Sequence, residues 1–170
     1  PKILTGDQAD VAASICRRVG IPSEVILTGA VLDQMTDDEL SKTVEKIHVF
    51  AELTPGQKVR IVSALRLNGH TVGFLGDGIN DIPALCEANV GISVDTAVDA
   101  AKDAADVVLL QKDLGVLEQG ILEGRKTFTN MLKYIKITAS SNFGNIFSIV
   151  CASAFLPFLP MTSLQILLLN

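Results

Sequence analysis

The chain has 170 residues, of which 48% are hydrophobic and 19% are charged, and its formal net charge is −5. This composition is ordinary for a globular protein, and the acidic balance argues against a nucleic-acid partner, because phosphate backbones need a basic protein face. The cysteines Cys16, Cys86 and Cys151 are widely spaced and form no Cys-x-x-Cys pattern, which argues against a disulfide framework or a zinc site.

The charged residues are confined to one part of the chain. No Asp, Glu, Lys or Arg lies between Ile137 and Asn170, so all 14 basic and 19 acidic residues belong to residues 1–136. We therefore expect a polar head followed by an apolar tail. Both ends interrupt an expected element and no signal-peptide pattern precedes the head, so we expect the chain to be a piece of a longer polypeptide.

The head begins with a strand, a turn and a helix. The apolar run Lys2–Leu4 leads into Thr5-Gly6-Asp7 and then into a helical pattern that Gly20 ends. Backbone N–H groups at such a turn, together with the Thr5 hydroxyl, can hold anionic oxygens at the positive end of the helix. Taken alone, this turn is more often a helix cap than a binding site.

The alternation continues, with strands expected at 24–27 and 47–50 and a helix from 36 to about 46. A further helix begins with Thr-Pro-Gly-Gln at 54–57, which supplies an N-cap, a proline at the first helical position and a capping-box glutamine. Lys58 then lies in the first turn, where the helix dipole disfavours a cation. It is either an ordinary exposed lysine or a lysine directed at a phosphate.

The sequence Gly-Asp-Gly-Ile-Asn-Asp at 76–81 follows another short apolar strand. Open parallel sheets bind ligands at the carboxyl ends of their strands, and glycines such as Gly78 let the backbone approach a ligand closely. Asp77 and Asp81, with Asn80 between them, offer hard oxygen ligands for a hydrated Mg²⁺ that carries phosphate. The alternative is an ordinary turn, because the same residue types favour turns.

Strands are also expected at 71–75, 89–92 and 106–110, with a short helix at 98–105. Strands that alternate with helices predict an α/β fold, with a Rossmann-type parallel sheet covered by helices on both faces.

From Gly115 onward the pattern is helical and contains no proline before Pro157. We expect residues 137–156, about 30 Å of helix, to cross a lipid bilayer with the preceding basic residues on the cytoplasmic side. The alternative is a buried core helix, which the amount of apolar chain beyond it disfavours. Residues 161–170 make about half a crossing, so we expect the start of a second transmembrane helix there.

The expected span carries polar residues on one face, namely Ser141, Asn142, Asn145 and Ser148. Polar groups in hydrocarbon must face protein or a water-filled path. Hydrogen bonding between helices and an ion path remain equally open for the serines. For Asn142 and Asn145 we favour an ion path, since their carbonyls are suitable ligands for a hard cation.

Together, the turns at 5–7 and 76–81, the segment Thr-Pro-Gly-Gln-Lys at 54–58 and the long helix resemble the carboxyl half of the phosphorylation domain of P-type cation-transporting ATPases, in the haloacid dehalogenase-like superfamily. The resemblance covers essentially the whole chain. It implies a partial phosphorylation domain at 1–124, a stalk helix at 125–136, a transmembrane helix at 137–156, a connecting turn at 157–160 and a truncated transmembrane helix at 161–170.

The resemblance also implies a role for each matching residue. Asp77 and Asp81 would bind the catalytic Mg²⁺, and Thr5 and Lys58 would hold the phosphoryl oxygens. The implied catalytic and phosphate-binding residues are Thr5, Gly6, Asp7, Lys58, Gly78, Asn80 and Asp81. An aspartyl-phosphate beside Asp77 would make a divalent cation and a lysine necessary.

Within the family, residues 140–145 and 152–160 resemble the magnesium-transporting branch, because calcium pumps typically carry a glutamate where this chain has Asn145. The expected function is an ATP-driven pump that forms an aspartyl-phosphate and imports Mg²⁺; the alternatives are a Ca²⁺ or H⁺ branch. We expect a multi-pass protein of the bacterial inner membrane with a cytoplasmic head.

The nucleophile of the family lies in Asp-Lys-Thr-Gly-Thr, a run that this sequence lacks. The nucleotide-binding and actuator domains and the earlier membrane helices are therefore expected partners from the same polypeptide, and we expect the isolated chain to be inactive. Two rival classes remain. A soluble phosphatase of the superfamily would share Lys58 and the turn at 76–81 but would have no uncharged tail, and a membrane-anchored module without catalysis would not need Thr5, Lys58, Asp77 and Asp81 together.

Overall fold

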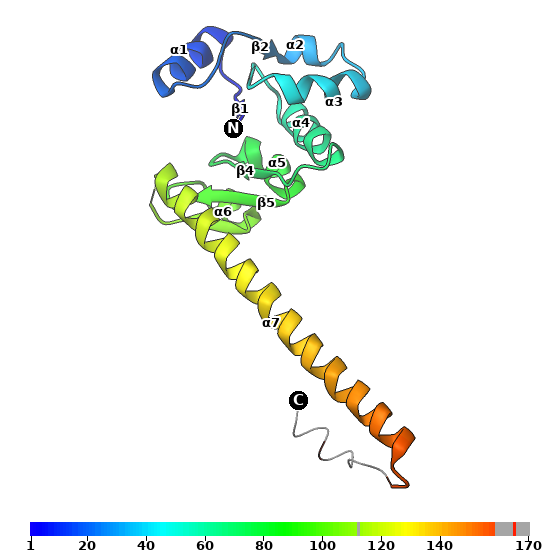
Figure 1. Ribbon diagram of the computed structural model, residues 1–170. Coiled ribbons are helices and arrows are strands. Elements are labelled where there is room, and N and C mark those ends of the chain that lie inside the picture. Colours follow the sequence, from blue (N-terminus) through cyan, green and yellow to red (C-terminus); the bar gives the residue numbers. More distant parts are fainter. Residues whose placement is uncertain (112, 159–164, 166–170) are drawn as a thin grey trace. The chain divides into compact units, whose positions relative to one another are not determined.

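The computed structural model describes residues 1–111, 113–158 and 165 (Figure 1). It divides into two compact units, Pro1–Asp113 and Leu114–Asn170. The first unit alternates strands and helices, and the described part of the second contains one long helix. The elements of the first unit are β1 (Ile3–Leu4), α1 (Ala9–Val19), β2 (Ile26–Thr28), α2 (Gly29–Leu32), α3 (Asp37–Lys46), β3 (Val49–Ala51), α4 (Pro55–Leu67), β4 (Gly73–Leu75), the 3₁₀ helix η1 (Ile79–Asp81), α5 (Ile82–Glu87), β5 (Val90–Val94), α6 (Asp99–Ala104) and β6 (Val107–Leu109).

The strands form two parallel sheets of three strands each, in the orders β1-β3-β2 and β4-β5-β6. The α/β class and the parallel pairing are confirmed, whereas the expectation of a single sheet is wrong. Alternating strands and helices predict parallel strands, but they do not say which strands pair. Leu4 of β1 packs against the hydrophobic clusters associated with both sheets, so side-chain packing joins them.

The first sheet is covered on both faces. Its central strand β3 is fully buried, and successive side chains of a strand point to opposite faces. Phe50 packs with apolar side chains from α2, α3 and α4. Val49 and Ala51 pack with Ala12 and Cys16 of α1. The helices α2, α3 and α4 therefore cover one face and α1 covers the other.

The starts of α3 and α4 follow from local sequence. Thr36 and Thr54 are N-caps whose side chains accept the backbone N–H of Glu39 and Gln57, and the Glu39 and Gln57 side chains accept the N-cap N–H in return. These are capping boxes, which satisfy N–H groups that lack partners within the helix. The expected start of α4 is thus confirmed, and with it the position of Lys58 in the first turn.

The second unit contains α7, a 42-residue helix from Leu114 to Phe155. It confirms the continuous helix expected from Gly115 onward. Among the described residues, no helix has a stretch long and apolar enough to cross a membrane. The assignment of residues 137–156 to a membrane stays a prediction. The polar residues of 137–156, including Asn142 and Asn145, lower the mean hydropathy of this segment. The second expected transmembrane helix, 161–170, lies outside the described residues except for position 165, as does part of the turn at 157–160.

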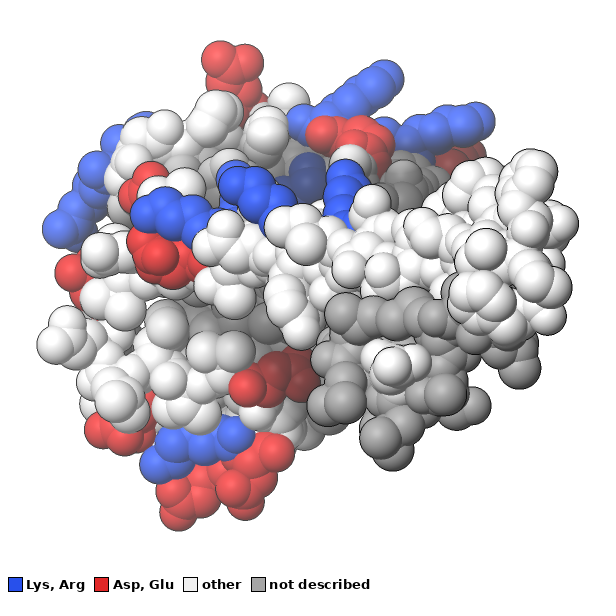
Figure 2. Space-filling model, turned by 60° about the horizontal axis from the view of Figure 1, so that its bottom comes forward, with Lys and Arg blue, Asp and Glu red and all other residues white. Residues whose placement is uncertain are grey.

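The second half of α7 exposes large apolar side chains. Phe143, Ile146 and Val150 are 72%, 61% and 62% exposed, and the rings of Phe143 and Phe147 stack with centroids 6.2 Å apart. Figure 2 shows that Lys, Arg, Asp and Glu side chains cover only part of the face in view. The described residues of α7 beyond Lys136 include no charged residue, so the side chains exposed there are apolar or uncharged polar ones. Such an apolar surface is typical of a segment that contacts other protein or lipid.

Candidate functional site

The candidate residues of the head follow the carboxyl ends of three strands. The turn at 5–7 follows β1, the segment that leads into α4 follows β3, and the turn at 76–81 follows β4. Since β1 and β3 pair in parallel, Thr5 and the start of α4 lie at the same edge of the first sheet. Asp77 lies at the corresponding edge of the second sheet, where open α/β folds place their ligands.

A buried ion pair connects these two edges. Nζ of Lys58 lies 2.7 Å from Oδ1 of Asp81, and the two side chains are only 10% and 15% exposed. Lys58 is therefore not an ordinary surface lysine. Its charge in the first turn of α4 is offset by a carboxylate rather than by solvent, and an ion pair shielded from water is stronger than an exposed one.

The backbone of the turn at 76–81 is tightly held. The N–H of Gly76 donates to β5 at 3.0 Å, and its carbonyl accepts the hydroxyl of buried Ser93 at 3.0 Å. A Cβ at Gly76 would lie 2.5 Å from the Cβ of Asp81, so this position requires glycine for a close approach. Asp77 and Asn80 are exposed. The turn thus holds its backbone in place while Asp77 and Asn80 stay accessible to a ligand.

The turn at 5–7 is closed by its own side chains. The Thr5 hydroxyl donates to Oδ2 of Asp7 at 3.0 Å and accepts the N–H of Asp7 at 3.1 Å. The N-cap of α1 is Gln8, which makes no side-chain cap bond, so the Thr-Gly-Asp turn is not the cap of this helix. The Thr5 carbonyl accepts the N–H of Leu53 at 3.0 Å, which fixes the turn against the segment that leads to Lys58.

Glu52 is a residue of this region that the sequence did not reveal. Its φ is 56°, a left-handed conformation that is uncommon outside glycine and costs about 1 kcal/mol. Its N–H donates to the carbonyl of Asp7 at 2.9 Å, and its carboxylate accepts the N–H of Ala9 at 3.4 Å. A glutamate after a short strand carries no sequence signal of a special backbone conformation.

The two carboxylates suit a magnesium ion. Within residues 1–111, 113–158 and 165, no group of three or more His, Cys, Asp or Glu could hold a metal ion. Mg²⁺ does not require such a cage, because it keeps several waters and is usually held by one or two carboxylates and the phosphates of its substrate. Asp77 and Asp81 supply that donor set, although one oxygen of Asp81 already binds Lys58.

The remaining candidates belong to the other unit. Asn142 and Asn145 lie in α7, three residues apart, and both are half-buried. The structure thus places these two asparagines on one helix, as the sequence predicted.

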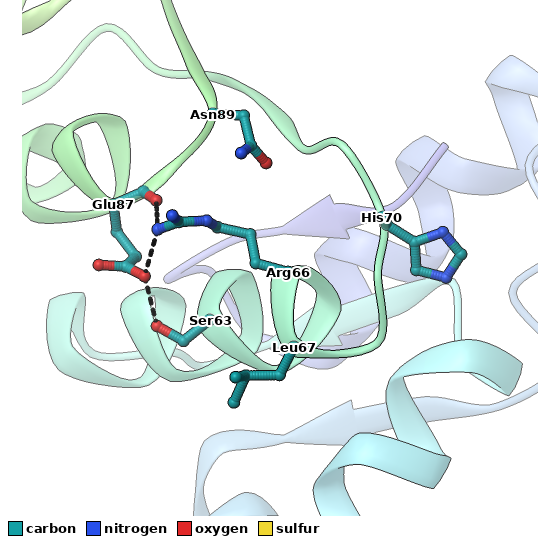
Figure 3. Close-up of a pocket in the computed structure, with 6 residues that line it drawn as sticks. All are labelled: Ser63, Arg66, Leu67, His70, Glu87 and Asn89. Carbon is teal, nitrogen blue, oxygen red and sulfur yellow. Dashed lines mark hydrogen bonds and ion pairs between the residues drawn. The ribbon is translucent and has the colours of Figure 1, made fainter.

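A separate hollow of about 460 Å³ lies beside the last turns of α4 and the end of α5 (Figure 3). Its lining residues are Ser63, Arg66, Leu67, His70, Glu87 and Asn89. Within it, Oε1 of Glu87 accepts Ser63 Oγ at 2.8 Å and Arg66 Nη1 at 2.7 Å. The hollow contains none of the candidate site residues, and its polar contacts tie α5 to α4.

The head is thus a parallel α/β domain in which a buried lysine, two carboxylates and a threonine hydroxyl follow the carboxyl ends of strands. The sequence model of the haloacid dehalogenase-like hydrolases matches residues 2–89, and the chain belongs to this family.

Curated relatives identify a narrower group within this family. The chain is 60% identical over 169 residues to "Magnesium-transporting ATPase, P-type 1" of Salmonella typhimurium LT2 and 57% identical to the protein of the same name from Escherichia coli K12. It is 39% identical to "Probable cation-transporting ATPase F" of Mycobacterium bovis. Each match covers 99% of this chain but 19% of the relative, so the chain spans about a fifth of their length. The resemblance to P-type ATPases is confirmed.

Solved structures agree with this class. A crystal structure of a zinc-transporting PIB-type ATPase in the E2.Pi state shares 28% identity with the chain, with a TM-score of 0.67 over 91% of this chain and 21% of its own. The catalytic CPx-ATPase domain CopB-B shares 28% identity, with a TM-score of 0.50 over 68% of this chain and 36% of its own.

Proposed function

We propose that the full-length protein containing this chain is an ATP-driven Mg²⁺ pump that forms an aspartyl-phosphate intermediate. The observation that carries the proposal is the buried Lys58–Asp81 pair beside Asp77, in a chain 60% identical to a magnesium-transporting ATPase. Phosphoryl transfer needs little covalent chemistry from the protein, so catalysis depends on positioning and on offsetting negative charge. A lysine, two carboxylates and a hydroxyl that follow the carboxyl ends of strands meet those needs.

The residues of the head have distinct tasks. Asp77 and Asp81 hold Mg²⁺, which when bound neutralises charge on the phosphoryl group. Lys58 lies within reach of Asp81 and supplies a second positive charge from a site that excludes most water. Thr5 exchanges its hydrogen bond to Asp7 for one to a phosphoryl oxygen. Gly6 and Gly78 leave their turns open to the ligand, and Asn80 is an exposed donor beside it.

The nucleophilic aspartate comes from the part of the full-length protein outside this chain. No Asp-Lys-Thr-Gly-Thr run occurs in the sequence. Within the described residues, β1 and β4 are edge strands of their sheets, so each can pair with a further strand. The nucleotide-binding and actuator functions belong to the same missing part, which makes up about four fifths of the curated relatives.

We extend the proposal to α7. Residues 137–156 lie in the membrane as one helix of a multi-helix domain, with the head in the cytoplasm. The absence of charge and the exposed apolar side chains of this segment support the assignment. Its hydropathy does not favour an isolated span, but its polar face can hydrogen-bond to neighbouring helices or line an ion path. Asn142 and Asn145 contribute carbonyl ligands to the transported ion.

Phosphorylation of the full-length protein by ATP tests the head assignment. Asp77→Asn removes one anionic Mg²⁺ ligand, so we expect it to abolish Mg²⁺-supported phosphoenzyme formation while leaving the fold intact. Asp38→Asn, an exposed aspartate in the first turn of α3, is the matched control and should behave as wild type. Wild-type phosphorylation of the Asp77 variant would refute the assignment.

Ion flux in proteoliposomes tests the transport assignment. We expect ATP-driven Mg²⁺ flux. Asn145→Leu should leave phosphorylation by ATP possible but abolish the dependence of phosphorylation on the transported ion. Flux of Ca²⁺ or protons instead would place the protein in another branch of the class. An Asn145→Leu variant with unaltered ion affinity would move the ion path to another helix.

A further inference from the structure

The position of Lys58 depends on how the first turn of α4 is held, and Gln57 holds it in two directions. Oε1 of Gln57 accepts the N–H of Thr54 at 2.8 Å, which is the capping box. Nε2 of the same amide donates to the carbonyl of Gly29 at 3.1 Å, and Gln57 is 8% exposed. The capping box alone would need only an acceptor, so the second bond serves another purpose.

Gly29 lies where no side chain fits. A Cβ at this position would be 2.5 Å from Oε1 of Gln57 and 2.5 Å from the carbonyl oxygen of Glu52, closer than real Cβ atoms approach. Its backbone conformation is not the reason for glycine, because its φ is not positive. The reason is the close approach of the Glu52 backbone and the Gln57 side chain.

Glu52 connects Gly29 to the turn at 5–7, which carries the second proposed phosphate-binding residue, Thr5. Its carbonyl faces Gly29, and its N–H donates to the carbonyl of Asp7 at 2.9 Å. Its left-handed backbone, φ 56°, turns the chain between these two contacts. One cluster, consisting of Gly29, Glu52 and Gln57, therefore joins the turn of Thr5 to the helix of Lys58.

We propose that Gly29 and Gln57 are positioning residues that fix the position of Lys58 relative to the turn of Thr5. The inference rests on the proposed phosphoryl transfer. Neither residue needs to touch the phosphoryl group: they act through the backbone of α4, whose first turn carries Lys58. A misplacement of about 1 Å at a reacting group can lower the rate about 100-fold.

The test uses the full-length protein, three variants and one control variant. Gln57→Glu keeps the capping-box acceptor and removes the donor to Gly29. Gln57→Met removes both the acceptor and the donor without adding charge. Gly29→Ala introduces the clash, and Gly56→Ala is its matched control, since a Cβ at Gly56 meets nothing within 4 Å. We measure the melting temperature, the KM for ATP, and kcat per folded molecule.

We expect both Gln57 variants to lower kcat by about 100-fold with little change in the KM for ATP, because a misplaced Lys58 acts on transfer rather than on nucleotide binding. Gly29→Ala should do the same or fail to fold, and Gly56→Ala should match wild type. Unchanged kcat per folded molecule in the Gln57 variants, or a loss in Gln57→Glu that Gln57→Met does not share, would overturn the inference. Failure of the proposed function is a separate result, visible as a wild-type protein that ATP does not phosphorylate.

Discussion

The helix α4 makes an ion pair near each end, and the two pairs differ in their surroundings. Near the start, the Lys58 and Asp81 side chains are 10% and 15% exposed. Near the end, Arg66 and Glu87 approach equally closely, at 2.7 Å, but are 40% and 33% exposed. Both pairs join α4 to the η1–α5 segment. Distance alone therefore does not distinguish a site from a surface contact, whereas shielding from water does.

The largest effect is expected at the buried end. Lys58→Met keeps the length of the side chain and removes its charge, so phosphoryl transfer in the full-length protein should slow by orders of magnitude. The same change leaves Asp81 without its partner at a largely buried position, and we expect the free energy of unfolding of the chain to fall by about 2 kcal/mol. Denaturant titration measures the second quantity. Unchanged turnover would remove Lys58 from the site.

The exposed end should respond far less. Glu87→Gln weakens the contacts to Arg66 and Ser63 but keeps the shape of the side chain (Figure 3). Because both partners are about a third exposed or more, we expect a loss of less than about 1 kcal/mol in unfolding free energy and no change in turnover. A loss as large as that of Lys58→Met would show that burial does not separate the two pairs.

A third contact near the end of α4 gives the smallest expected effect. Hydrogen bonds from Asn68 and His70 hold the pKa of Glu45 below its ordinary value. Because the pKa of Glu45 is lowered in the folded state, its carboxylate contributes to folding stability above the ordinary glutamate pKa. This contribution is lost as the pH falls through the lowered pKa. We expect a slight fall in melting temperature over that acidic range.

The control for that effect is Glu45→Gln, which cannot titrate. The difference in melting temperature between wild type and this variant should shrink as the pH falls. A difference that stays constant from neutral to acidic pH would show that Glu45 makes no charge-dependent contribution.

The predictions from the sequence succeeded where the cause is local. Each capping box, at Thr36 and at Thr54, lies within four consecutive residues, and both helices begin where the sequence predicted. The turns at 5–7 and 76–81 likewise lie at strand ends as expected. Local hydrogen bonding and backbone preference decide such features, so a single stretch of sequence contains the information.

The predictions failed or were silent where distant segments meet. Lys58 and Asp81 are 23 residues apart, and nothing near Lys58 indicates which carboxylate it binds. The division into two sheets depends on strand pairing, which periodicity does not encode. Gly29 looks like an ordinary residue after a short strand, and only the packing of Glu52 and Gln57 around it explains the glycine.

The central claim is that the Lys58–Asp81 pair belongs to a Mg²⁺-dependent phosphoryl-transfer site, and Asp81 tests it most directly. The measurement is the rate of phosphoenzyme formation by the full-length protein as a function of Mg²⁺ concentration, for wild type and Asp81→Asn. Asparagine keeps an oxygen for Lys58 but loses the anionic ligand, so we predict that half-maximal rate requires at least about tenfold more Mg²⁺. A variant with the same Mg²⁺ dependence as wild type would contradict the account, because Asp81 would then serve only to hold Lys58 in place.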